Sequence, residues 1–275
     1  MLRSVLLVGA ALVGMSGPAQ AQAPVPEALG RQRALLTEAP PRTLALLTFN
    51  IRHAEGSDGK IDVARVAQVI RDSKAEIVGL QEVDRGVERS GRRDLLKEIA
   101  DLCGMQLAFG KNIDHQGGDY GNALLTTRPI VSVGNRALPN TDGSEQRGVL
   151  QVVLDVDGTR VLVLTTHLDH RRADGQRLAS ADALLEMVQT FGDGPVVAMG
   201  DFNDVPDSAT WRRLTATFTD VWAAVGAGDG FTIPVEVPSK RIDWVLVRGL
   251  QPQSAAVITT QASDHLPVAA VVQLR

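Results

Sequence analysis

The chain has 275 residues, 44% of them hydrophobic and 22% charged, which is the composition of an ordinary globular protein. Its formal net charge of −4 and its aromatic content of 4% argue against a protein that attracts nucleic acid or an anionic membrane through its overall charge. Its single cysteine excludes an intramolecular disulfide. A basic groove confined to one face is still compatible with these numbers.

The N-terminal segment has the pattern of a secretory signal peptide. Arg3 precedes an apolar run over residues 5–13, and small residues with an A-x-A site fill 17–23. The apolar run is too short to span a bilayer as a mature helix, although an uncleaved N-terminal anchor is the alternative. We therefore expect residues 1–23 to be removed and the mature chain to be periplasmic or secreted.

Residues 24–42 contain four prolines and predict an N-terminal tail or linker, whereas 43–275 predict one folded domain. In that domain, apolar runs of strand length alternate with helical patterns. We expect strands over 43–50, 76–82, 105–110, 120–126, 130–137, 147–156, 160–167, 195–200, 241–247, 253–260 and 265–273. We expect helices over 62–74, 92–103, 174–191 and 207–216.

Two pairs of expected strands follow each other without a helix between them. They are 120–126 with 130–137, and 147–156 with 160–167. A purely parallel sheet requires a crossover between neighbouring strands, so this order favours mixed sheets packed together with helices outside.

Polar side chains able to bind a metal or move a proton stand at the ends of several expected strands. They are Asn50, Glu82, His167, Asp201, Asn203, Asp243, Asp264 and His265. Each alone has a simpler explanation, such as a turn, a cap or a hydrogen-bonded structural histidine. Their joint occurrence predicts an active site, because rigid scaffolds present catalytic groups at strand ends.

The residue types indicate which chemistry this site supports. The oxygen ligands of Asn50, Glu82 and Asp264 suit Mg²⁺, Mn²⁺ or Ca²⁺ rather than Zn²⁺. Two histidines then remain free for proton transfer and for hydrogen bonds to a phosphoryl oxygen. The sequence contains no G-x-S-x-G or H-E-x-x-H motif that would favour another hydrolase class.

These motifs, taken in order, resemble the endonuclease/exonuclease/phosphatase superfamily, which includes nucleases similar to DNase I, inositol-polyphosphate phosphatases and neutral sphingomyelinases. The matching segments are 48–50, 80–83, 120–123, 166–168, 200–203, 241–243 and 263–267. The resemblance spans residues 43–275 and implies a four-layer α/β/β/α sandwich, in which two mixed sheets pack face to face under outer helices. It also implies a catalytic domain that hydrolyses phosphate esters with Mg²⁺.

The resemblance further implies a role for each matching residue. Glu82 would be the principal Mg²⁺ ligand, with Asn50 and Asp264 nearby. Asp201 would position the attacking water, and Asn203 would hold that water or the phosphoryl group.

Other roles concern the proton and the phosphoryl oxygens. His265 would be the general base or a charge stabiliser, oriented by Asp243. His167 and Tyr120 would donate hydrogen bonds to the non-bridging oxygens, and Asn122 would support them.

Three further residues are candidates for substrate binding, although ordinary loop positions explain them equally well. His53 follows Asn50 closely, Arg147 occupies a position where the resemblance often places a polar residue, and His170 precedes two arginines.

The sequence thus predicts an exported phosphodiesterase or phosphomonoesterase acting by metal- and histidine-assisted attack of water. An extracytoplasmic nuclease would require a basic groove, for which only Arg85, Arg89, Arg92 and Arg93 stand out. A sphingomyelinase-like phospholipid phosphodiesterase would require an apolar surface that no segment clearly provides. A non-catalytic binding protein on the same fold is the third alternative. We expect a small phosphate-ester substrate, and no protein partner is evident.

Overall fold

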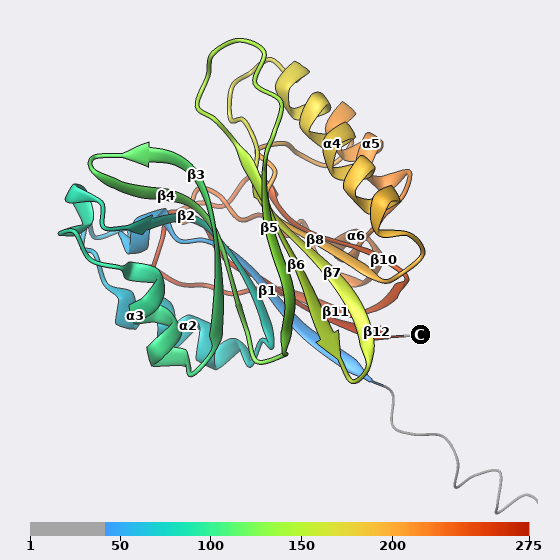
Figure 1. Cartoon of the computed structure of the whole chain (residues 1–275), viewed down its shortest axis with the longest axis horizontal. Coiled ribbons are helices and arrows are strands. Elements are labelled where there is room, and N and C mark those ends of the chain that lie inside the picture. The colour runs from blue at the N-terminus through green and yellow to red at the C-terminus, as the bar shows by residue number, and fades with distance from the viewer. Residues whose placement is uncertain (1–41, 275) are drawn as a thin grey trace, which may run out of the picture. The chain divides into compact units, whose positions relative to one another are not determined.

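The computed structural model describes residues 42–274, shown in Figure 1. The expected signal peptide and almost all of the expected linker lie outside the described residues. Within them, the chain forms two six-stranded sheets with helices.

The first sheet has the strand order β11-β12-β1-β2-β4-β3. Its strands are β1 (Thr43–Asn50), β2 (Ile77–Arg85), β3 (Gln106–His115), β4 (Gly118–Thr126), β11 (Leu250–Val257) and β12 (Val268–Leu274). Only β1 and β2 pair in parallel, and the other neighbours are antiparallel.

The second sheet has the strand order β5-β6-β7-β8-β10-β9. Its strands are β5 (Ile130–Ala137), β6 (Gly148–Val156), β7 (Thr159–His167), β8 (Val196–Asp201), β9 (Thr219–Asp220) and β10 (Asp243–Arg248). Here β7 and β8 form the parallel pair. Both sheets are mixed, as the order of strands without intervening helices predicted.

The helices are α2 (Val63–Ser73), α3 (Leu95–Cys103), α4 (Gly175–Phe191), α5 (Ala209–Thr215) and α6 (Val221–Val225), with the 3-10 turns η1 (Arg52–Ala54) and η2 (Glu88–Ser90). Figure 1 shows α2 and α3 on one side of the molecule and α4 and α5 on the other, with the sheets between them. The predicted four-layer sandwich is therefore confirmed.

Three hydrophobic clusters hold these layers together. In the central cluster, Leu46 and Ile77 of the first sheet share a core with Val163 and Val197 of the second. Because successive side chains along a strand point to opposite faces, the neighbouring residues point to the outer face of each sheet. The outer faces therefore provide two further cores, which the helices cover.

The outer cores explain why the helices form where they do. Val66 and Ile70 of α2 pack in one cluster with Phe49 of β1, and Leu184 of α4 packs in another with Leu164 of β7. Such burial contributes on the order of 2 kcal/mol per large aliphatic side chain. Among residues 42–274, no helix is both long enough and apolar enough to cross a membrane.

Most expected elements are present, with three kinds of difference. The last strand begins at Val268 rather than at 265, because residues before it form a loop in which Leu266 N donates to Thr232 O. Strand β3 continues to His115 instead of ending at 110 and forms a hairpin with β4, at whose tip His115 pairs with Gly118. Both β9 and α6 were missed, since they are too short to show a period.

Candidate active site

The strand registers bring the predicted polar residues to one edge of the sandwich. In the second sheet, Asp201 on β8 pairs with both His167 on β7 and Asp243 on β10. In the first sheet, the parallel pairing of β1 with β2 ends at Asn50 opposite Gln81. The site is therefore assembled from both sheets.

A β-bulge directs Glu82 towards Asn50. The pairing of β2 with β4 shifts register between Leu80 and Val83, and Glu82 lies in the left-handed region with a φ of 59°. A bulge breaks the regular alternation of side chains along a strand. Asn50 Nδ2 donates to Glu82 Oε1 over 2.9 Å, so the two residues at the ends of β1 and β2 are joined.

Asp201 is the centre of the hydrogen-bond arrangement, and its side chain is almost completely buried. Its Oδ2 accepts from Asn50 Nδ2 at 3.1 Å and lies 3.5 Å from His167 Nε2 and 3.7 Å from His265 Nε2. Its Oδ1 accepts from the backbone N–H of Asn203 at 2.9 Å. Asn203 Nδ2 donates to the carbonyl of Leu168, which fixes this turn. Burial raises the pKa of Asp201 to about 7, while neighbouring His265 opposes the rise.

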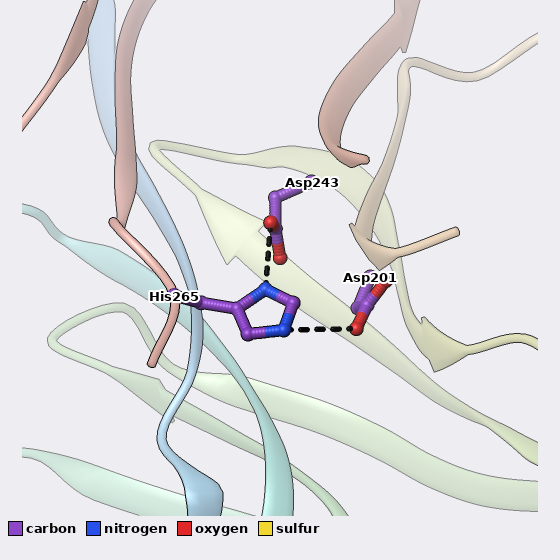
Figure 2. A group of neighbouring side chains, drawn as sticks. All are labelled: Asp201, Asp243 and His265. Carbon is purple, nitrogen blue, oxygen red and sulfur yellow. Dashed lines mark hydrogen bonds and ion pairs between the residues drawn. The ribbon is translucent and has the colours of Figure 1, made fainter. Parts of the chain in front are cut away.

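His265 lies between two carboxylates, as Figure 2 shows. Its Nδ1 is 2.9 Å from Asp243 Oδ2, and its Nε2 faces Asp201. Burial lowers the pKa of His265, but attraction to Asp243 and then to Asp201 outweighs burial and raises it to about 10. This electrostatic setting favours the imidazolium form, so of the two predicted roles it supports charge stabilisation more than that of a base.

His167 occupies the opposite electrostatic environment. Its Nδ1 lies 3.0 Å from Arg147 Nη1, and Arg147 Nη2 lies 3.2 Å from His170 Nδ1. Burial, and then the positive charge of Arg147, hold the pKa of His167 well below its ordinary value. The structure thus brings His167, Arg147 and His170 together as predicted, although Arg147 is engaged by the two histidines and by Glu145 at 3.0 Å.

The residues expected to hold a metal converge around Asn50. Its amide nitrogen contacts Glu82, and its backbone carbonyl accepts from Ser263 Oγ at 2.7 Å, next to Asp264. Its Oδ1 accepts from the N–H of Arg52 and has a second lone pair that stays available, while its Nδ2 orients Glu82.

The donor set fits a hard divalent cation. Glu82 and Asp264 supply carboxylate oxygens, the ligand type that Mg²⁺ prefers. The guanidinium of Arg52 lies 3.6 Å from Asp264, so this carboxylate already faces a positive charge. One ligand atom each from Asp201, Asp243 and His265 also lies within 4.8 Å of the others, close enough to hold a metal. The hydrogen bond between His265 and Asp243 makes that trio better suited to proton chemistry.

Tyr120 and Asn122 lie on β4 of the first sheet. Tyr120 is buried, and burial and then the charge of Glu82 raise its pKa. Asn122 Nδ2 donates to the carbonyl of Gly148 at 3.0 Å, which also accepts from Thr166 Oγ1. Asn122 therefore joins the two sheets beneath the site.

His53 lies in η1 near Asp84 and Arg89, outside the hydrogen-bond arrangement around Asp201. Its Nε2 contacts Glu55 at 3.3 Å, and it lies in a left-handed turn with a φ of 44°. Its buried Nδ1 has no hydrogen-bond partner among residues 42–274. No contact joins His53 to Asp201 or to His265 within that part of the chain.

Two residues beside the site, Asp84 and Glu145, were not singled out from the sequence. Asp84 is fully buried and holds Arg89 through two hydrogen bonds of 2.9 and 2.8 Å, and the Arg89 guanidinium lies 5.4 Å from the Tyr120 ring centroid. The spacing of Asp84 two residues after Glu82 on one strand could have indicated it. Glu145 lies in a loop without a pattern, and no sequence signal pointed to it.

Comparison with known proteins agrees with this architecture. The Escherichia coli (strain K12) protein YbhP is 29% identical over 245 residues, which cover 83% of this chain and 96% of YbhP. A crystal structure of an endonuclease/exonuclease/phosphatase from Beutenbergia cavernae is similar with a TM-score of 0.69 and 24% identity, over 85% of this chain and 72% of that one. The mannosyl-6-phosphatase Bt3783 of Bacteroides thetaiotaomicron has a TM-score of 0.71 at 20% identity, over 83% of this chain and 99% of that one. Residues 47–265 match the model of the Endonuclease/Exonuclease/phosphatase family, and the chain therefore belongs to this family.

Proposed function

We propose that this protein is a divalent-metal-dependent phosphoesterase that hydrolyses a small phosphate ester by attack of water. Members of its family are hydrolases of phosphoester bonds and generally depend on a divalent metal. The observation that carries the proposal is the arrangement around Asp201. One oxygen of the Asp201 carboxylate faces both histidines. His265 is paired with the carboxylate of Asp243, and His167 contacts the guanidinium of Arg147.

This arrangement supports a division of roles in the reaction. Asp201 is oriented by Asn50 and Asn203 and is placed to hold the attacking water and accept its proton. His265, charged between Asp201 and Asp243, stabilises negative charge that develops on the phosphoryl group. His167 donates a hydrogen bond to a non-bridging oxygen.

Glu82 and Asp264 are the residues that would hold the metal, with Asn50 orienting Glu82. Mg²⁺ is the preferred ion, and Mn²⁺ or Ca²⁺ would suit the same oxygen ligands. When bound, the cation would neutralise charge on the phosphoryl oxygens. The chain's own residues supply the orientation and the proton transfer.

The charges around the site favour a small substrate over a nucleic acid. The four arginines that the nuclease hypothesis required are each paired with a carboxylate in the structure. The pairs are Arg85–Asp94, Arg89–Asp84, Arg92–Glu88 and Arg93–Glu98. The paired carboxylates lower the net positive charge that this segment presents to a polyanion such as DNA. The similar fold of a protein named a mannosyl-6-phosphatase supports the same choice.

The test compares four substrates with and without EDTA, using the chain that lacks residues 1–23. They are nitrophenyl phosphate, bis-nitrophenyl phosphate, plasmid DNA and sphingomyelin. We expect hydrolysis of a small ester that requires Mg²⁺ and falls by about 10²-fold or more in His265→Ala, because one charge-stabilising donor contributes roughly that factor. Asp264→Ala is expected to raise the Mg²⁺ concentration needed for half-maximal rate.

Arg213→Gln serves as the matched control, because Arg213 forms an exposed ion pair with Asp182 outside the site. It is expected to retain the wild-type rate. Activity that survives both EDTA and His265→Ala would contradict the mechanism. Cleavage of plasmid alone would instead support the nuclease alternative.

We also propose that the protein acts outside the cytoplasm. The support is the sequence of residues 1–23, with Arg3, a short apolar run and an A-x-A site. Cell fractionation followed by N-terminal sequencing is expected to find a chain that begins after Ala21 or Ala23 in the periplasm or medium. A full-length chain in the cytoplasm would refute export, and one in the membrane fraction would indicate an uncleaved anchor.

A further inference from the structure

Arg147 is a buried arginine that bridges two histidines at the end of β7. Its Nη1 lies 3.0 Å from Nδ1 of His167, and its Nη2 lies 3.2 Å from Nδ1 of His170. The side chain of Arg147 is only 8% exposed. Burying a guanidinium costs free energy unless hydrogen bonds and an opposite charge compensate for the lost hydration. These contacts therefore indicate that the position of Arg147 is specified by its surroundings.

The chemistry of these contacts decides where the histidine protons are. A guanidinium carries five N–H donors and no acceptor, and it stays protonated in proteins. Both imidazole Nδ1 atoms must therefore be acceptors. A histidine whose Nδ1 accepts a hydrogen bond is neutral and carries its proton on Nε2. His167 consequently directs an N–H, from Nε2, at Asp201 Oδ2, 3.5 Å away.

His265 shows the reverse arrangement on the same carboxylate. Its Nδ1 donates to Asp243 Oδ2 over 2.9 Å, and its Nε2 also faces Asp201 Oδ2. A carboxylate partner stabilises the charged ring, whereas an arginine partner excludes it. Pairs of titratable groups that are driven apart in this way mark a division of acid and base roles.

We propose that Arg147 is a positioning residue that holds His167 and His170 in the neutral form protonated at Nε2, so that Nε2–H of His167 is directed into the site. The proposal rests on the proposed phosphoesterase function, because the Nε2–H of His167 is the group that would meet a phosphoryl oxygen. Arg147 then acts through the histidines rather than by contacting the substrate directly, the role for which the sequence made it a candidate.

The surroundings of Arg147 keep it in place. Glu145 lies 3.0 Å from Nη1 and balances its charge, and the Arg147 carbonyl accepts from Leu138 N and from Gln146 Nε2. The loop between β5 and β6 is in turn held to α4, where Gln176 contacts Thr141. A side chain fixed by its loop in this way loses little entropy when it orients two rings.

The charged groups that face His167 agree with this assignment. Burial and then the positive charge of Arg147 disfavour the charged form of His167, and Asp201 is the acid that approaches it. Burial and Arg147 hold the pKa of His167 well below its ordinary value.

The direct test is ¹⁵N NMR of the chain without residues 1–23, labelled at histidine and studied in EDTA near pH 7.5. The chain has only five histidines, so a histidine-to-glutamine variant at each position assigns the signals. We expect His167 and His170 to show a protonated Nε2 and an unprotonated Nδ1. A His167 protonated at Nδ1, or at both nitrogens, would overturn the proposal in the unmodified protein.

Arg147→Gln and Arg147→Lys test the cause. Neither side chain can reproduce the two-pronged contact, so His167 should become a mixture of tautomers and titrate closer to ordinary histidine. We expect kcat for the small ester to fall by about 10²-fold with a smaller change in KM, because a misoriented group affects mainly the transition state. Arg213→Gln should leave both the tautomers and kcat unchanged. Unchanged tautomers in both Arg147 variants would refute the role of Arg147.

The two proposals fail in distinguishable ways. If the protein hydrolyses none of the tested esters but the tautomers are as expected, the proposed function fails and the histidine arrangement stands. If hydrolysis requires His265 but His167 is protonated at Nδ1, the function stands and the role of Arg147 fails.

Discussion

At the scale of single residues, Asp201 depends on neighbours that belong to both sheets. Asn50 donates from β1 of the first sheet, and His265 approaches from the loop before β12, whereas His167 comes from β7 of the second. Asp201 itself is buried on β8. A carboxylate in this position is sensitive to each neighbour, because unpaired charge in the interior is costly.

The ion pair between Asp243 and His265 is expected to stabilise the fold in a pH-dependent way. The pKa of His265 is raised in the folded chain, so this stabilisation is fully present below the unfolded value of roughly 6.5 and is lost as the pH rises through about 10. Asp243→Asn removes the buried partner and should lower the free energy of unfolding at pH 7 by about 3 kcal/mol.

Urea denaturation in EDTA between pH 7 and pH 10.5 checks this prediction. The difference between Asp243→Asn and the unmodified chain should shrink as the pH approaches the upper limit. A difference that is constant over the whole range would show that Asp243 contributes through packing rather than through the charge of His265. Asp182→Asn, which alters an exposed surface pair, is the control.

At the scale of elements, the bulge in β2 places a functional side chain at the expense of backbone strain. Glu82 has a φ of 59°, a region that a non-glycine residue occupies at a cost of roughly 1 kcal/mol. The register shift between Leu80 and Val83 holds it there. Asn203 after β8 is also left-handed, with a φ of 49°. Two of the non-glycine residues with positive φ, Glu82 and Asn203, thus carry side chains of the site.

Substitution of Glu82 by glycine and by alanine should separate strain from function. Glu82→Gly is expected to be more stable than Glu82→Ala by about 1 kcal/mol, because glycine adopts a positive φ without penalty. Both variants should lose metal-dependent hydrolysis. Denaturation midpoints and the rate with nitrophenyl phosphate are the measurements.

Gln106 on β3 provides the matched pair of control variants, since it is exposed and has no positive φ. There the order should reverse, with glycine less stable than alanine by about 0.5–1 kcal/mol. If alanine is also the more stable residue at position 82, the bulge is not strained in the way described.

Also at this scale, hydrophobic patterns identified the elements because each outer helix and strand buries one face. Strands β1 and β5 have the expected bounds, and Asp62, the first residue of the expected helix, accepts from Arg65 N at the start of α2. The bulge could not be predicted, because it depends on the pairing of β2 with β4 and leaves no local sequence pattern. The loop before β12 was taken for strand, since its apolar residues are buried by tertiary contacts.

At the scale of the whole molecule, the strand order predicted mixed sheets with outer helices, and the family resemblance added the four layers and the residues that gather at one edge. The resemblance named Asp243 as the residue that orients His265, but nothing in the sequence named Arg147 as the partner of His167. His167 ends β7 and His265 lies shortly before β12, so both stand near a strand end. Yet His265 contacts Asp243, whereas His167 contacts Arg147. These partners are 22 and 20 residues away and are set by how the sheets dock. Pairing of this kind is decided by three-dimensional packing.

The contacts of Asn50 with Asp201 and of His265 with Asp243 have a consequence for the order of events in folding. Partners in the first pair are 151 residues apart in the chain, so they meet only after distant segments have closed into both sheets. Folds with many such distant pairings form slowly, and no fragment containing one sheet alone holds the complete set of groups. Catalytic activity should therefore appear only when the layers have docked. During refolding, the chain should become compact and show helical circular dichroism before it hydrolyses substrate.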